Sequence, residues 1–245
     1  MMRAAHAFIL AAMATAAATG AAAAETRTFD LDPFEAIDIA TGLDAVVTVG
    51  EPQTVRVEAG NSQVFDKLTV VVEGGKLSAY LDTDFFDFIM EGGLLGMLVN
   101  GRPDVTIHIT VPALRDIAAS SGADIVARGV TGENLELSAS SGSDVSITGL
   151  AVGRIAGSAS SGASLALAGT CEGFEIDASS GSSVDAEDLV CKSIDANASS
   201  GASIEVHASE RARAEASSGG DVRIYGNPPD TDFDSSSGGD VELDT

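Results

Sequence analysis

The stretch Ala119-Ser120-Ser121-Gly122-Ala123-Asp124-Ile125 decides the fold, because the triplet at its centre, Ser-Ser-Gly, occurs seven times in the chain. The copies end at Gly122, Gly142, Gly162, Gly181, Gly201, Gly219 and Gly238, so successive glycines are 20, 20, 19, 20, 18 and 19 residues apart. A fixed period of this size is typical of a solenoid, in which each repeat buries its apolar side only by stacking on its neighbours.

Apolar residues recur at fixed distances from these glycines. Three residues after each glycine stand Ile125, Val145, Leu165, Val184, Ile204, Val222 and Val241, and alanine stands three residues before six of the seven. An alternation of period two inside a period of about twenty predicts short strands joined by bends, one coil per repeat. The repeats are rich in Ser, Gly, Val and Asp, which are poor helix formers, so a helical solenoid is not expected, and a β-sandwich would not return the same tripeptide at the same bend. The sequence therefore predicts an all-β, right-handed parallel β-helix.

The triplet itself is predicted to form the corner of each coil. Its glycine is expected at the bend, where a positive φ would penalise a Cβ atom. The alternation of buried and exposed positions predicts that the second serine, Ser121 in the first copy, points inward and that the first serine points outward. Because seven identical sites serve a scaffold better than an active site, we interpret the serines as structural rather than catalytic or ligand-binding.

The residues before the repeats divide into two parts. Residues 1–24 read as a signal peptide, with Arg3, an apolar stretch from Ala7 to Ala18 and small residues before Glu25. Residues 25–115 read as a less regular, strand-rich part of the same β-helix, with a hairpin over residues 68–81 around Gly74-Gly75. Residues 116–245 hold the regular repeats, and we expect one continuous domain.

An apolar insertion at residues 83–102 interrupts the strand-rich part. Two interpretations stay open: a cap that covers an end of the core, as solenoids require, or an exposed patch for a partner or for self-association. The candidate patch consists of Phe85, Phe86, Phe88, Ile89, Met90, Leu94, Leu95 and Met97. The insertion is too short to span a membrane, and no transmembrane segment is expected in the mature chain.

The chain is strongly acidic, with 13 Lys and Arg against 37 Asp and Glu. This balance excludes nucleic acid and anionic membrane surfaces as partners, because both need a basic footprint. We expect the acidity to serve solubility, and no cofactor is predicted. Calcium is the one alternative, because stacked outward carboxylates about 4.8 Å apart would repel each other without a cation. Its weak candidate ligands are Asp124, Asp144, Asp221 and Asp240.

Two cysteines, Cys171 and Cys191, lie one repeat apart, and each stands ten residues before the next triplet glycine. They should therefore occupy the same position on adjacent coils, at a spacing near the lower limit of what a disulfide can span. Export favours oxidation, and the chain has only three histidines. We predict a disulfide between them rather than a metal site.

The chain also resembles the exported bacterial family of autotransporter adhesin heads known as the GIN domain. The resemblance rests on Phe34-Glu35-Ala36-Ile37-Asp38-Ile39, the strand Val105–Val111 followed by Pro112-Ala113-Leu114, the Ser-Gly bends, and Tyr225-Gly226-Asn227-Pro228. It implies a right-handed β-helical exported domain, with adhesion suggested by the family's name. No membrane-barrel segment follows the repeats in this sequence, so the resemblance does not extend to self-transport.

Two functions from different classes follow. The first is a noncatalytic module of the bacterial periplasm or cell surface, adhesin-like, which binds an unidentified protein, a glycan or its own copies. The alternative is a carbohydrate-active enzyme that uses outward-facing carboxylates such as Asp124 and Asp144. No nucleophile elbow, phosphate loop or zinc motif is present, and no catalytic residue is predicted.

Overall fold

The computed structural model describes residues 25–60, 62–82 and 105–244. These residues form 17 strands and one short 3-10 helix, η1 (Ser62–Asp66). The strands are β1 (Glu25–Phe29), β2 (Ala36–Ile39), β3 (Asp44–Val49), β4 (Thr54–Ala59), β5 (Leu68–Glu73), β6 (Lys76–Leu81), β7 (Val105–Val111), β8 (Asp116–Ala119), β9 (Asp124–Arg128), β10 (Thr131–Ala139), β11 (Asp144–Ala159), β12 (Ser164–Ala178), β13 (Ser183–Ser199), β14 (Ser203–Ser217), β15 (Asp221–Tyr225), β16 (Asp230–Ser235) and β17 (Asp240–Asp244).

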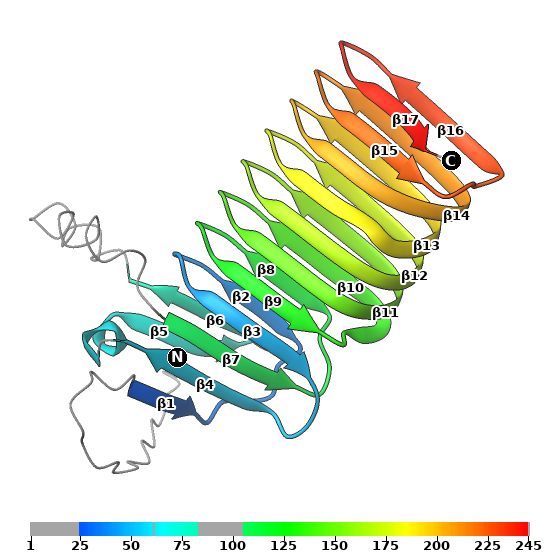
Figure 1. Cartoon of the computed structure of the whole chain (residues 1–245). Coiled ribbons are helices and arrows are strands. Elements are labelled where there is room, and N and C mark those ends of the chain that lie inside the picture. The colour runs from blue at the N-terminus through cyan, green and yellow to red at the C-terminus, as the bar shows by residue number, and fades with distance from the viewer. Residues whose placement is uncertain (1–24, 61, 83–104, 245) are drawn as a thin grey trace, which may run out of the picture.

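The strands build a flattened, right-handed parallel β-helix with two facing walls (Figure 1). One wall runs from β5 through β6, β2, β8 and β10 to β16, and the other from β1 through β4, β7, β3 and β9 to β15 and β17. The long strands β11 to β14 bend and contribute to both walls. The fold class predicted from the period is therefore confirmed.

The register places equivalent residues of successive coils side by side. For example, Ile117 lies beside Leu137, and this column continues through Gly157, Ile176, Ala196 and Ala214 to Phe233. From Ile117 to Ala214 the apolar members of the column are almost fully buried. Gly157 makes room for bulkier neighbours, because a Cβ there would lie 2.7 Å from Ile176 Cδ1 and 3.4 Å from Phe174 Cε2. The walls thus pack closely around a narrow core.

Each triplet forms a type I′ β-turn. In the first copy Ser121 and Gly122 both have positive φ, 53° and 75°, and Ala123 N donates to Ser120 O at 3.2 Å. The same hydrogen bond closes the other six turns at 2.9 to 3.3 Å. The expected positive φ of the glycine is confirmed, and the serine before it shares that conformation.

The predicted inward orientation of the second serine is wrong. Ser121 and its equivalents are exposed, and the buried corner position belongs instead to the residue after the glycine, such as Ala123 or Ser143. The reason is physical: two consecutive residues of positive φ break the alternation of an extended strand. Ser143 Oγ accepts from Ser140 N and donates to Ala119 O, both at 3.0 Å, so its buried hydroxyl is satisfied.

The first coil lies within the N-terminal part of the chain. There β2 and β3 are joined by Thr41 and Gly42, which have φ of 59° and 68°, and Gly42 N donates to Ser121 O at 3.0 Å. This coil stacks directly on β8 and β9. It escaped the repeat pattern because threonine and glycine replace Ser-Ser-Gly and because residues 50–115 separate it from the next coil.

Strands β4 to β7 extend both walls beyond this first coil. β5 and β6 form the predicted antiparallel hairpin around Gly74 and Gly75, while β6 and β7 pair in parallel with β2 and β3. β6 ends and β7 begins beside the corner where β2 and β3 have their turn. The apolar insertion predicted at residues 83–102 lies outside the described residues, as does the predicted signal peptide.

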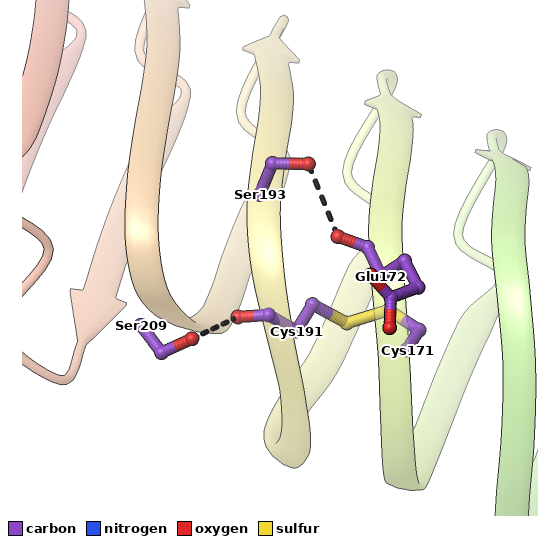
Figure 2. Close-up of a disulfide and its surroundings, with 5 residues drawn as sticks. All are labelled: Cys171, Glu172, Cys191, Ser193 and Ser209. Carbon is purple, nitrogen blue, oxygen red and sulfur yellow. Dashed lines mark hydrogen bonds between the residues drawn. A yellow bond between two sulfur atoms is a disulfide. The ribbon is translucent and has the colours of Figure 1, made fainter.

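The two cysteines occupy one column at the bend opposite the turns. Cys171 and Cys191 are in register on β12 and β13, their Cα atoms are 4.5 Å apart, and a disulfide joins them (Figure 2). Hydroxyls bind the backbone beside this bridge: Ser193 Oγ donates to Glu172 O at 3.1 Å and Ser209 Oγ to Cys191 O at 3.2 Å (Figure 2). The predicted disulfide is confirmed.

The turn geometry yields a first prediction. Gly162 has a φ of 72°, so Gly162→Ala should lower the free energy of unfolding by about 1–2 kcal/mol, the cost of an L-residue in this region. Gly50→Ala is the matched control, because Gly50 lacks a positive φ and its Cβ would meet only Thr110 Cγ2 at 3.8 Å. Urea unfolding followed by circular dichroism measures both. Equal losses in the two variants would contradict the turn argument.

The disulfide yields a second prediction. The bridge closes a loop of 20 residues, so Cys171→Ala with Cys191→Ala should lower the free energy of unfolding by about 3 kcal/mol. Thiol titration of the unfolded, unreduced wild-type chain should find no free thiol among these two cysteines. Two titratable thiols would show that the bridge does not form.

Candidate functional site

A groove crosses the outer surface at the bends between the two walls. Its central column consists of Asn134, Arg154, Gly173, Ser193, Arg211 and Asp230, each in register with the next. Beside it lie Glu133, Gly153, Glu172, Lys192 and Glu210. The groove therefore runs along the stacking axis over successive coils, and its volume is about 710 Å³.

Small residues create the hollow. Gly173 and Ser193 stand between Arg154 and Arg211 in the column, where longer side chains would fill the space. Gly153 lies so close to the preceding coil that a Cβ would come within 2.7 Å of Glu133 O. The Ser193 hydroxyl is turned to Glu172 O. The floor between Arg154 and Arg211 is thus formed by backbone and small side chains.

Two of the three bases in the groove are paired with acids of the neighbouring coil. Lys192 Nζ contacts both carboxylate oxygens of Glu172, at 2.9 and 2.7 Å, and this hydrogen bond raises the pKa of Lys192. Arg211 Nε lies 2.7 Å from Asp230 Oδ2. Arg154 makes no ion pair within the described part of the chain. Its guanidinium can therefore bind a ligand without first giving up a partner.

The arrangement favours binding of an extended polar ligand. Arg154, Lys192 and Arg211 can donate hydrogen bonds, Asn134 can donate and accept, and the glutamates can accept from hydroxyls or amides. The groove is open along its length and lined by coils rather than closed by a loop. Such a surface suits a chain-like ligand that follows the axis of the solenoid.

The predicted calcium ligands lie elsewhere. Asp124 and Asp144 are neighbours on β9 and β11, and Asp221 and Asp240 are neighbours on β15 and β17. Asp44 extends the first pair to a column of three. None of them lines the groove. Over the described residues, no three His, Cys, Asp or Glu side chains are placed to hold one metal ion.

The groove could have been found in the sequence by one further alignment. Its central residues stand eight positions before the glycines of six triplets, from Asn134 before Gly142 to Asp230 before Gly238. The core columns are recognised because their residues are all apolar. This column instead mixes asparagine, arginine, glycine, serine and aspartate. The signal for the groove in the sequence is a set of polar, charged and small residues that all stand eight positions before a triplet glycine. The predicted partner patch around Phe85 and Met97 lies outside the described residues.

Comparison with known proteins agrees with this geometry. The family model described as "Putative auto-transporter adhesin, head GIN domain" matches residues 33–228. The chain belongs to the GIN domain family. The resemblance noted in the sequence is thereby confirmed. No protein of curated function matches the sequence. Across the described residues, no helix has the length and apolar character to cross a membrane.

Solved structures share the fold of this GIN domain protein. A putative adhesin from Bacteroides fragilis is 17% identical with a TM-score of 0.78, and the match covers 91% of this chain and 98% of that one. A putative lipid binding protein from Parabacteroides distasonis is 16% identical with a TM-score of 0.66, covering 91% and 97%. A putative adhesin from Parabacteroides merdae is 15% identical, also with a TM-score of 0.66, covering 91% and 96%. At these identities the comparisons establish the common architecture.

The acidic columns yield a third prediction. Calcium at millimolar concentration, compared with excess chelator, should leave the midpoint of thermal unfolding unchanged, because a ligand stabilises a fold only if the folded state binds it. The four candidate aspartates stand in pairs, whereas calcium takes six to eight oxygen ligands. A rise of several degrees with calcium, lost in Asp124→Asn with Asp144→Asn, would instead assign a cation to that pair.

Proposed function

We propose that this protein is a noncatalytic, exported binding module of the bacterial envelope or cell surface, and that it binds its partner through the axial groove. The observation that carries the proposal is the groove itself: six coils contribute donors and acceptors to one continuous hollow of about 710 Å³, with Arg154 free of an ion pair among the described residues. A flat stack of coils would need no such hollow for stability.

Export is supported by independent features. Residues 1–24 have the composition of a signal peptide, and the disulfide between Cys171 and Cys191 suits an oxidising compartment. The family description and the names of two structural relatives speak of adhesins. A third relative is named as a lipid binding protein, but the charged and polar lining of this groove suits a hydrophilic ligand better than an acyl chain.

A binding role is favoured over the alternative of a carbohydrate-active enzyme. A glycosidase needs two carboxylates flanking the bound sugar, one of them as a proton donor. Asp124 and Asp144 belong to an outward column on a wall and do not line the groove. Within the groove, Glu172 is held by Lys192 and Asp230 by Arg211. These two acids already serve as structural partners of bases. The remaining groove acids, Glu133 and Glu210, lie on β10 and β14, four coils or about 19 Å apart, which is too far for two carboxylates that act on one sugar.

A fourth prediction tests the proposal. The labelled chain 25–245 is titrated onto whole cells and onto purified cell-surface polysaccharides, and Arg154→Ala with Arg211→Ala should weaken binding at least tenfold. A hydrogen bond to a charged group contributes roughly 1.5–3 kcal/mol, and about 1.4 kcal/mol corresponds to tenfold in affinity. The matched control is Arg115→Ala with Arg128→Ala, which removes two exposed bases outside the groove.

The outcomes separate the two functions. Equal loss in both double variants would contradict a specific groove, since it would reduce the effect to net charge. Release of new reducing ends from a polysaccharide, abolished by Asp124→Asn with Asp144→Asn, would establish the enzyme instead. Binding without turnover, lost only in the groove variant, supports the proposal.

A further inference from the structure

The last coil leaves core positions uncovered. β16 pairs only with β14, and β17 pairs only with β15, so each has one free edge within the described residues. Phe233 is 36% exposed and Leu243 is 39% exposed, whereas Ala214 and Ile224, their equivalents one coil earlier, are fully buried. Figure 1 shows β16 and β17 at the end of the stack, with no strand beyond them. A free edge of this kind is a template for another strand.

Acidic residues occupy the outward positions of this coil. On β17, Asp240, Glu242 and Asp244 alternate with Val241 and Leu243. On β16, Asp230, Asp232 and Asp234 alternate with Thr231 and Phe233 in the same way. The terminal edge therefore combines apolar side chains on its inner side with a row of carboxylates on its outer side.

In two outward columns near this end the charges alternate in sign along the stacking axis. In one column Glu205, Arg223 and Glu242 follow each other, and Arg223 lies 3.6 Å from Glu205 and 3.1 Å from Glu242. In the other wall, Asp195, Arg213 and Asp232 follow each other. The hydrogen bond to Glu215 is the main cause of the raised pKa of Arg213, and both aspartates raise it further. The next member of each column would complete the pattern if it were a base.

The same edge of a second copy does not suit this edge. Pairing β17 with β17 of another copy would place carboxylates opposite carboxylates, which is destabilising in a sheet. The charge of the edge instead complements a cationic strand. Charges on the edge of a sheet are also a common device against self-association, which leaves the edge available to a partner of opposite charge.

We propose that the free edge of β17 binds an extended segment of another protein by strand addition, and that this segment carries Lys or Arg at alternate positions with apolar side chains between them. Main-chain hydrogen bonds to the edge provide affinity, and the alternating side chains provide specificity. The Lys or Arg side chains of the bound segment lie beside Asp240, Glu242 and Asp244, and the apolar side chains of the segment cover Val241 and Leu243. This site is separate from the groove, so either proposal can fail without the other.

The experiment uses the chain 25–245 and a seven-residue peptide of alternating lysine and valine. Fluorescence anisotropy measures affinity, and hydrogen exchange measures protection of the amides of residues 240–244. The peptide should bind, should protect these amides and should bind more weakly as salt rises. Asp240→Asn with Glu242→Gln and Asp244→Asn should weaken binding at least tenfold. None of these three residues lines the groove.

Two controls make the result specific. Asp185→Asn with Glu187→Gln and Asp188→Asn removes the same charge from exposed positions away from the end and should leave the affinity unchanged. A peptide with four lysines followed by three valines should bind at least tenfold more weakly than the alternating one. Equal binding of both peptides, equal loss in both triple variants, or absence of amide protection would overturn the proposal. So would sedimentation that reveals a dimer with protection at β17, because the edge would then belong to a second copy.

Discussion

The structure depends on one hydrogen-bonded corner that every coil repeats. Two consecutive residues with positive φ reverse the chain, and the turn closes with a hydrogen bond from the residue after the glycine. From Gly42 to Gly181 the glycine amide of the turn also donates to the carbonyl of the second serine of the next coil, as in Gly122 N to Ser141 O at 3.1 Å and Gly142 N to Ser161 O at 3.1 Å. The corner therefore reverses the chain and also sets the distance and register between coils.

This corner explains where the repeat can vary in length. The intervals of 18 and 19 residues do not disturb the turns or the wall columns, which stay in register along the whole stack. The register shifts all fall in the bends opposite the turns: between Ile147 and Leu150, between Ala166 and Gly169, between Ala186 and Val190, and between Cys191 and Ser193. The groove lies along these same bends. Variation is thus tolerated where the surface can change without loss of stacking.

The sequence predicts the features that recur with the repeat. It does not predict features at positions where the repeat is interrupted or where its residue types differ from coil to coil. The core columns and the disulfide follow from residues one repeat apart, because stacking converts sequence distance directly into spatial contact. The orientation of Ser121 was wrong because strand alternation does not continue through two residues of positive φ. The first coil was hidden because Thr41 and Gly42 form its turn with other residue types. The groove was not predicted because the residues of its central column stand at the same position of each repeat but differ in residue type.

The distribution of bases shows why an acidic scaffold of this kind can still carry local sites. Five of the eleven described bases join coils through ion pairs along the axis, including Lys76 with Asp116, Arg115 with Glu35 and Lys192 with Glu172. The pairing with Asp116 raises the pKa of Lys76. Such exposed pairs contribute little energy individually, but they offset the repulsion between stacked carboxylates.

Places where this pairing is incomplete differ from the remainder of the surface. In the described residues these include Arg154, which makes no ion pair, and the last coil, where Asp230, Asp232 and Glu242 have a base on one side only. Arg154 and the acids of the last coil are exposed and lie outside the turns. Residues at these positions can therefore differ, and contact a ligand, without disturbing the register of the coils.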